Sequence, residues 1–369
     1  MREAPLRRQG GAVALSPAAG MAQAPSAPRS SLLREFTLQQ APLILAALAL
    51  GFVTAYLQHG FVPGADRPYP LAGVRMPVWH VIWMGAWTGY TMALVGQAAG
   101  IFALPYSTSV LQFSNPHVTP STLLLTFLNP IGALLGFRRT GQWNLHFAGW
   151  LCAGGVLGGL IGPFLRAGLL ADVDVFRLLL GLALAFVSVQ LAHKALSGFA
   201  AGEKAPGGGV GAPRIVTLAR ERARITIGYR GGQWTLHQGV LFALGATVGV
   251  ISSALGLGGA FLIVPFLVVV YKVPMYVVPA ATIPYAVALS ATGLLTYCLL
   301  LPLLGAAPLA PEWAWGFFAA AGGIFGSWVA AKTQLHVPEP LLNAMLGAVL
   351  AAVAILYVTN FFFPLPFRF

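Results

Sequence analysis

Residues Gly245 to Pro265 read GATVGVISSALGLGGAFLIVP, an apolar stretch in which glycines and a proline interrupt a membrane-type helix. The same interruptions occur 160 residues earlier, in GAWTGYTMALVGQAAGIFALP from Gly85 to Pro105. The matched positions are Gly85, Ala86, Gly89, Gly96 and Pro105 with Gly245, Ala246, Gly249, Gly256 and Pro265. Interrupted apolar segments at corresponding places in two halves of a chain are typical of secondary transporters and mark their binding sites.

Two further motifs keep the same order in both halves. AGGVLG, from Ala153 to Gly158, returns as AGGIFG from Ala321 to Gly326, and LLLGLALA at 178–185 returns as AMLGAVLA at 344–351. Helices rich in alanine and glycine also resemble one another through composition alone. Because three motifs recur in one order, we interpret them as an internal repeat.

Composition decides the class of protein. Hydrophobic residues make up 57% of the 369 residues and charged residues only 8%, too few to cover a soluble surface, so we predict a polytopic membrane protein. The net charge of +12 falls in the tail and loops, as the positive-inside rule expects, and indicates no nucleic-acid partner. Cys152 and Cys298 lie alone in apolar runs and are predicted to be packing residues.

The chain divides into five predicted parts, and the predicted fold is an all-α polytopic membrane protein with two inverted repeats. They are a disordered cytoplasmic tail (1–39), an extra N-terminal transmembrane helix (40–58), a first repeat (80–196), a cytoplasmic linker with a possible small β-meander (197–236) and a second repeat (237–363). Met21 is an alternative start. Each repeat is predicted to hold one broken hairpin and three transmembrane helices.

Charged loops predict the topology. Arg138, Arg139, the 197–236 linker, Lys272 and Lys332 mark cytoplasmic connections, and the N-terminal tail is basic too. Under this assignment each hairpin enters and leaves by one face, and the two hairpins enter from opposite faces. Their limbs, 80–96 with 100–113 and 239–255 with 259–271, are short for a membrane ~30 Å thick, so we predict re-entrant hairpins. Two short full crossings are the alternative.

The hairpin tips are the predicted substrate site. A helix that restarts after a glycine turn presents free N–H groups and the positive end of its dipole, which suits an anion. Helix breaks and buried amides or hydroxyls near the tips complete the prediction. The candidate residues are Gly96, Gln97, Gly100, Thr122, Asn129, Ser253, Gly256, Gly258, Gly259 and Thr282.

Each candidate has a plainer interpretation. Small residues also serve close helix packing, which accounts well for Gly85 and Gly89 but less well for a glycine run at a chain reversal. A serine or threonine in a helix most often bonds to its own backbone. Asn129-Pro130 and Thr282-Ile283-Pro284 are predicted to interrupt their helices.

Acidic residues are placed away from the predicted site. All nine lie in the tail, in loops or at helix ends, so the sequence offers no membrane-depth carboxylate to relay protons or hold sodium. An inside-negative potential favours anion exit by about 2.3 kcal/mol per charge per 100 mV, so export needs no coupling ion. Neither a cofactor nor a metal site is predicted, and the absence of an intramembrane carboxylate, Ser/His pair or metal-type cluster disfavours an enzyme.

The segment GLGGAFLIVPFLVVVYKVPMYVVPAAT, from Gly256 to Thr282, resembles the hallmark of the TauE/SafE sulfite exporter family. The resemblance covers about residues 80–362. It implies two inverted bundles with broken re-entrant helices that move sulfite or organosulfonate anions across the cell inner membrane. The positions carried over are Gly256, Gly258, Gly259 and Pro265, with Gly96, Gly100 and Pro105 in the first half. The departures from the family pattern are Ala98, Ala99 and Ala260, whose methyl groups are expected to narrow the approach of an anion to the backbone.

Two functional hypotheses follow. The first is a transporter that exports sulfite, an organosulfonate or a related sulfur oxyanion. The alternative is a non-transporting membrane protein that assists sulfur or metalloprotein maturation through residues 197–236. The sequence leaves the anion, the coupling and the oligomeric state open.

Overall fold

The computed structural model describes residues 34 and 36–363, except 63, 96–97, 114–115, 141–143, 171, 202–214, 230, 275–276, 308 and 334–336. Within these residues, eight helical segments are long and apolar enough to cross a membrane. They are Phe36–His59, Val118–Leu135, Leu145–Ala167, Asp174–Ala200, Gln238–Leu255, Pro279–Leu303, Trp313–Thr333 and Asn343–Phe362. The prediction of a polytopic membrane protein is confirmed.

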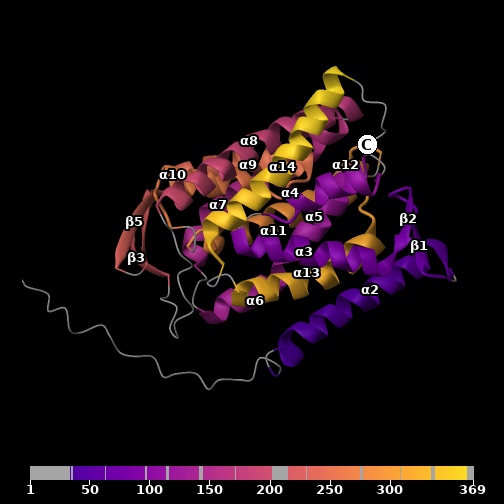
Figure 1. Ribbon diagram of the computed structural model, residues 1–369, viewed down its shortest axis with the longest axis horizontal. Coiled ribbons are helices and arrows are strands. Elements are labelled where there is room, and N and C mark those ends of the chain that lie inside the picture. The colour runs from indigo at the N-terminus through magenta and orange to yellow at the C-terminus, as the bar shows by residue number, and fades with distance from the viewer. Residues whose placement is uncertain are drawn as a thin grey trace, which may run out of the picture.

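The chain begins, where it is described, with a helix and a hairpin that precede the repeated part. Their elements are η1 (Phe36–Gln40), α2 (Ala41–His59), β1 (Asp66–Tyr69) and β2 (Val74–Pro77). The antiparallel pair β1–β2 lies in a region for which the sequence predicts no element. Helix α2 runs beside α13 at the edge of the bundle (Figure 1). Several of its hydrophobic side chains are exposed, including Leu45, Tyr56 and Leu57.

Each half contains one broken helix followed by longer helices. The first half holds α3 (Val78–Val95), α4 (Gly100–Pro105), η2 (Tyr106–Val110), α5 (Val118–Leu128), α6 (Pro130–Thr140), α7 (Leu145–Ala167) and α8 (Val173–Ala200). The second half holds α9 (Gln238–Leu255), α10 (Ala260–Val269), α11 (Pro279–Leu295), η3 (Thr296–Leu300), α12 (Leu301–Leu303), α13 (Trp313–Thr333) and α14 (Glu339–Phe362).

The limbs of the two hairpins are unequal. The first limbs, α3 and α9, have 18 residues each, whereas α10 has only 10. Helix α4 with its continuation η2 is similarly short, at 6 and 5 residues. At 1.5 Å per residue a limb of this length extends roughly 15–17 Å, about half of a bilayer core. The second limbs are therefore short for a full crossing, whereas α9 is among the helices long and apolar enough to cross a membrane, so the re-entrant hairpins stay a prediction.

Helices of the first half pack mainly against helices of the second half. Helix α3 packs against α13, α9 packs against α7, and α8 packs against α14. The repeated glycines make these contacts: Gly245 faces the Leu151 carbonyl, and a methyl group on Gly158 would lie 2.5 Å from Gly249 Cα. The equivalent Gly85 and Gly326 face the carbonyls of Ala319 and Ala86. Because small residues let backbones approach closely, the recurrent glycines have a packing role in both halves.

Two predicted helix breaks have different outcomes. At Asn129-Pro130 the chain changes from α5 to α6, as predicted. At Pro284 the prediction of a break is wrong, because α11 continues from Pro279 to Leu295 with Pro284 inside it. Proline removes one backbone donor, and a buried membrane helix tolerates this loss where its neighbours hold it in place.

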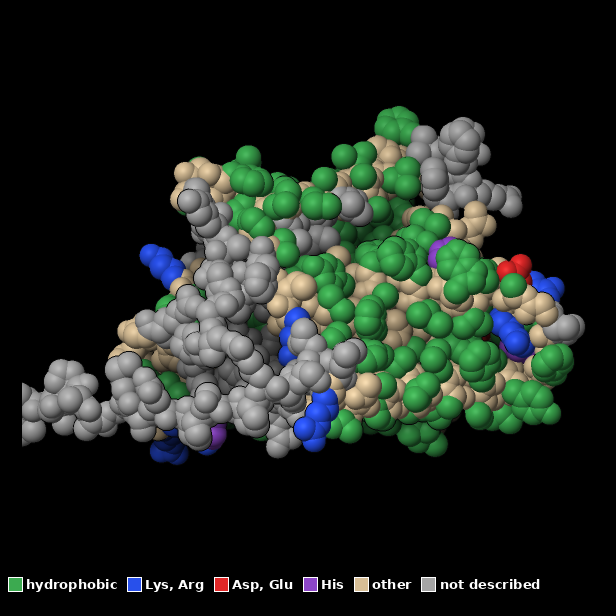
Figure 2. All heavy atoms as spheres, turned by 60° about the horizontal axis from the view of Figure 1, so that its bottom comes forward, with side chains coloured by type: hydrophobic (Ala, Val, Ile, Leu, Met, Phe, Trp, Pro, Cys, Tyr) green, Lys and Arg blue, Asp and Glu red, His purple; other side chains and the backbone are tan. Residues whose placement is uncertain are grey.

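A three-stranded antiparallel sheet stands between the halves, in the region of the predicted β-meander. Its strands are β3 (Val216–Arg220), β4 (Arg224–Tyr229) and β5 (Gly232–His237), in that order. This sheet and the β1–β2 pair lie at opposite ends of the helical bundle (Figure 1). On the face that Figure 2 shows, hydrophobic side chains cover much of the described surface between the ends, and Lys and Arg side chains lie mainly toward the ends.

Candidate functional site

The two hairpin tips meet in the interior. Gly256, Gly258 and Gly259 have φ angles of 79°, 79° and 88°, which reverse the chain between α9 and α10. Such angles favour glycine, because a side chain would clash with the backbone. Gly100, at the start of α4, faces this turn: a methyl group on it would overlap the Gly256 carbonyl oxygen and lie 2.9 Å from Leu257 C. The tips therefore touch through their backbones.

One face of α5 covers both tips. Thr119, Thr122, Thr126 and Asn129 are spaced by three or four residues and therefore share this face. A methyl group on Gly256 would lie 2.6 Å from Thr122 Oγ1 and 3.1 Å from Thr119 Cα. A methyl group on Gly258 would lie 2.5 Å from both Thr126 Cγ2 and Ala98 Cβ. We call these four residues the polar face of α5.

Backbone donors at the tips differ between the halves. The Gly100 N–H donates to Thr126 Oγ1 at 3.1 Å, so the first tip already uses this donor. At the second tip, the N–H groups of Gly258 and Gly259 meet no acceptor in the described part of the chain. Both glycines are buried, and they precede the N-terminus of α10, where the helix dipole is positive. The second tip thus offers buried donors.

The structure brings together only part of the predicted site. Gly100, Thr122, Gly256, Gly258 and Gly259 lie at the meeting point of the tips. Asn129 lies one helical turn beyond Thr126 on the polar face of α5. Gly96 and Gln97 fall outside the described residues.

The hydroxyls of three candidates, Thr122, Ser253 and Thr282, have backbone partners. Thr122 Oγ1 lies 3.0 Å from the Val118 carbonyl and 2.9 Å from the Thr119 carbonyl of its own helix. Ser253 Oγ is 2.9 Å from the Gly158 carbonyl and 2.7 Å from the Gly249 carbonyl, which ties α9 to α7. Thr282 Oγ1 donates to the Val278 carbonyl of its own helix at 3.3 Å. These hydroxyl groups thus bond to backbone carbonyls, as serine and threonine in helices most often do.

Asn129 keeps an unpaired amide in the interior. Its side chain is fully buried, and neither Oδ1 nor Nδ2 has a hydrogen-bond partner among the described residues. The amide lies against Gly323 of α13, where any side chain would overlap it. An unpaired buried amide costs about 1–3 kcal/mol, and such groups are often explained by function or by an unobserved water or ligand.

Three contributors are absent from the sequence prediction. Thr126 contacts both tips, and Tyr285 packs its ring on Gly259 while its hydroxyl donates to the Gly245 carbonyl at 2.9 Å. Thr126 shares the i, i+4 spacing of Thr122, which is the signal that could have found it. Tyr285 has no such signal, because its contacts depend on the packing of α11 against α9.

The third contributor is a buried cation at the far end of the polar face. Arg166, in the last turn of α7, is fully buried. Its Nε donates to Thr119 Oγ1 at 3.1 Å, its guanidinium also donates to the Leu170 carbonyl, and its Cζ lies 4.1 Å from the centre of the Phe176 ring. The arginine also borders a cavity of about 140 Å³ with Pro116 and Leu309. A positive charge thus touches the polar face of α5.

Comparison with known proteins adds the family. A model of the sulfite exporter TauE/SafE family matches residues 81–357, which include both hairpins and the polar face of α5. The chain belongs to the TauE/SafE sulfite exporter family. The match confirms the family that the sequence resembles. Members of this family are membrane transporters and not enzymes. Neither a curated protein nor a solved structure matches the chain significantly.

The TauE/SafE match separates the chain into two parts. The family segment begins at residue 81, so α2 and the β1–β2 hairpin precede it. The segment contains every candidate site residue named above, including Arg166. The site is therefore built wholly from the TauE/SafE portion of the chain.

Proposed function

We propose that this TauE/SafE protein exports sulfite, an organosulfonate or a related sulfur oxyanion, bound between the hairpin tips. The observation that carries the proposal is the pair of buried N–H groups of Gly258 and Gly259, without an acceptor among the described residues. Oxyanions need several donors at once, and a helix N-terminus in a water-poor interior supplies them without a side-chain charge.

The polar face of α5 supplies the rest of the pathway. Arg166 lies at the outer end of this face, where it bonds to Thr119. Thr122 and Thr126 flank the tips. Beyond them, Asn129 has an amide without a partner among the described residues. Arg166 carries positive charge and the Asn129 amide has an unpaired donor among the described residues, as an anion path requires. The hydroxyls of Thr122 and Thr126 donate to carbonyls of their own helix and contribute by packing beside the tips. We expect a small oxyanion such as sulfite to be favoured over a bulky sulfonate, because the Ala98 methyl group packs closely beside Gly258.

Inverted repeats would account for the packing of each half's helices against those of the other half. Helices α3 and α9 take equivalent places in the halves, and each packs against the helix of the other half that carries the AGG motif. An inverted arrangement brings one hairpin in from each membrane face. We infer that the sheet end is cytoplasmic, that the protein lies in the plasma membrane, and that the anion leaves at the Arg166 end down the membrane potential.

Flux measurements test the proposal. Wild-type protein in liposomes should show saturable efflux of labelled sulfite that increases with an imposed potential. Gly258→Ala should reduce this efflux at least tenfold, because a methyl group would lie 2.5 Å from Ala98 Cβ and Thr126 Cγ2. Gly305→Ala is the matched control: its φ of 82° is similar, but nothing lies within 4 Å. Equal efflux from the two variants, or no oxyanion flux in the wild type, would overturn the proposal.

Cysteine labelling tests the orientation. Gly231, in the β4–β5 turn, and Gly305, after α12, both have open space around them. In intact cells, a membrane-impermeant maleimide should label Gly305→Cys and not Gly231→Cys. The reverse pattern would place the sheet outside.

A further inference from the structure

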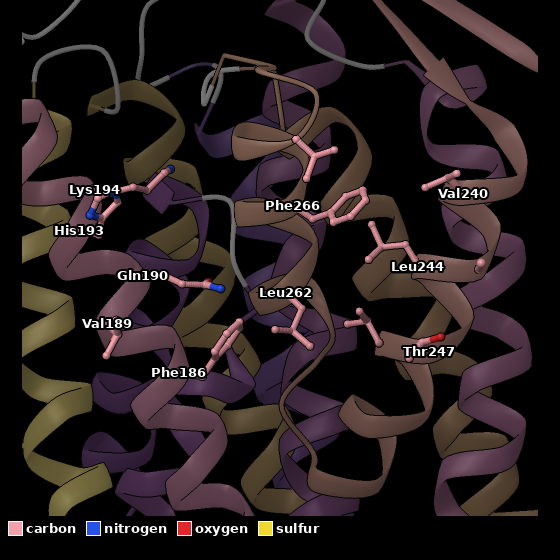
Figure 3. Close-up of a pocket in the computed structure, with 13 residues that line it drawn as sticks. Phe186, Val189, Gln190, His193, Lys194, Val240, Leu244, Thr247, Leu262 and Phe266 are labelled. Atoms are coloured by element: carbon pink, nitrogen blue, oxygen red, sulfur yellow. The ribbon is translucent and has the colours of Figure 1, made fainter.

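A groove runs along the bundle between α8, α9 and α10. It encloses about 800 Å³, and each of the three helices contributes one face to it (Figure 3). Its wall is apolar, with Phe186 from α8, Leu244 from α9, and Leu262 and Phe266 from α10. Such a volume holds a ligand of several hundred daltons, far larger than sulfite.

The polar groups of the groove gather toward one end. Gln190, His193 and Lys194 lie on the same helix as Phe186, and Figure 3 shows His193 and Lys194 above Gln190 with Phe186 below. Eight residues of helix separate Phe186 from Lys194, roughly 12 Å along the axis. The residues that line the groove include no aspartate or glutamate. The groove therefore combines an apolar length with a basic end.

The groove opens toward the side of the bundle and not into its core. Val189 and Val270, which line it, are 68% and 58% exposed, and Phe186 is 50% exposed. In a membrane, these side chains would face the acyl chains of the bilayer. The basic end lies toward the end of α8, α10 and the start of α9 next to β5, the sheet end that we infer to be cytoplasmic.

We propose that this groove binds an anionic phospholipid. The phosphate would lie at Lys194 and His193, and an acyl chain would follow Phe186, Leu244 and Leu262 toward the membrane interior. Charge complementarity selects this occupant, because basic pockets between transmembrane helices on the cytoplasmic side hold anionic lipid head groups. The occupant would also contact α10 three residues after Gly259, so it would support the short limb that forms the second tip.

Native mass spectrometry of the full-length protein tests the proposal. Phosphatidylglycerol and phosphatidylcholine with identical acyl chains would be added in equal amounts to delipidated protein. We expect phosphatidylglycerol to be retained at least fivefold more, because one basic group near the surface contributes about this factor. This comparison uses the wild type, so it does not depend on whether a variant folds. Equal retention of the two lipids would overturn the proposal.

Variants locate the site. Lys194→Gln should lower retention of phosphatidylglycerol about fivefold, whereas Lys332→Gln, in the last turn of α13 and outside the groove, should leave it unchanged. Ala243→Trp should fill the groove and lower retention of both lipids. An equal effect of Lys194→Gln and Lys332→Gln would contradict the assignment.

A soluble head group separates lipid binding from phosphate binding. Glycerol 3-phosphate should neither raise the melting temperature nor compete with phosphatidylglycerol, because it lacks the acyl chain that fills the groove. Competition at similar concentration would overturn the lipid assignment. Sulfite flux through the tips can fail or succeed independently of these results.

Discussion

The α-carbon of Gly100 lies against the carbonyl oxygen of Gly256, so the two halves of the protein meet backbone to backbone at their hairpin tips. A side chain on Gly100 would separate the tips, and a side chain on Gly256 would overlap Thr122 of α5. Thr126 adds a hydrogen bond to the Gly100 N–H at 3.1 Å and packs beside Gly258. Because the two tips are in direct contact, we expect a movement of one hairpin to displace the other.

Gly100→Ala should reduce both stability and sulfite flux. The added methyl group overlaps the Gly256 carbonyl, and overpacking of this kind costs about 1–3 kcal/mol. Gly149→Ala in α7 is the matched control, because nothing lies within 4 Å of that position and alanine favours a helix. Thermal melting and liposome efflux measure the two effects. A Gly100→Ala protein as active as Gly149→Ala would show that the contact between the tips is dispensable.

Thr126→Val should impair transport while keeping the shape of the side chain. It removes the acceptor of the Gly100 N–H and leaves a buried donor unpaired, at a cost of about 1–3 kcal/mol. Thr88→Val is the control, because the Thr88 hydroxyl is also buried but, within the described part of the chain, bonds to carbonyls of its own helix, Met84 and Gly85. We expect a lower melting temperature and lower efflux for Thr126→Val alone. Similar losses in both variants would refute a specific role for Thr126.

Arg166→Gln should weaken transport mainly through a higher KM. A charge beside a low-dielectric passage raises the local concentration of anions by tenfold or more. Arg166→Lys keeps the charge and should retain efflux within about threefold of the wild type. Added salt should reduce the wild-type advantage over Arg166→Gln, which a merely structural arginine would not do. Flux that is insensitive to salt in both proteins would argue for a packing role.

Glu312 should make stability depend on pH. Its carboxylate is fully buried before α13, where Oε2 accepts the Leu71 N–H at 2.8 Å and the Ala72 N–H at 3.3 Å. Burial raises the pKa of Glu312 above its ordinary value of 4.5, an effect that exceeds the opposing hydrogen bonds from Leu71, Ala72 and Gln58 and the influence of His117. Because the folded-state pKa is the higher one, stability from this group is complete below pH 4.5 and declines as pH rises through the folded pKa.

Glu312→Gln isolates this effect. Glutamine keeps an acceptor for the β1–β2 turn but does not ionise, so the variant should lose the Glu312 contribution to the decline of stability with pH. Melting temperatures of both proteins between pH 4.5 and 8 give the difference curve. A wild type that gains stability relative to Glu312→Gln as pH rises would reverse the sign and disprove the prediction.

The local sequence was informative wherever the backbone geometry admits only one type of residue. Positive φ angles at Gly256, Gly258 and Gly259 require glycine, and the run GLGG therefore predicted a chain reversal. The packing role of Gly85 and Gly89 was also predictable, because only small residues let two helices approach closely. The prediction of a helix break at Pro284 was wrong, because a proline breaks a helix only where the neighbouring helices do not hold the backbone in place.

The sequence alone determined the class, the family and the two interrupted segments, because hydropathy, glycine spacing and motif order are properties of the linear chain. Only the tertiary structure decided which side chains pack at the tips or along the polar face of α5. Thr126, Tyr285 and Arg166 come from α5, α11 and α7, helices brought together by contacts between residues far apart in the chain. Ser253 and Thr282 are bonded to backbone carbonyls instead, because a hydroxyl in a helix takes whichever acceptor the packing places nearest.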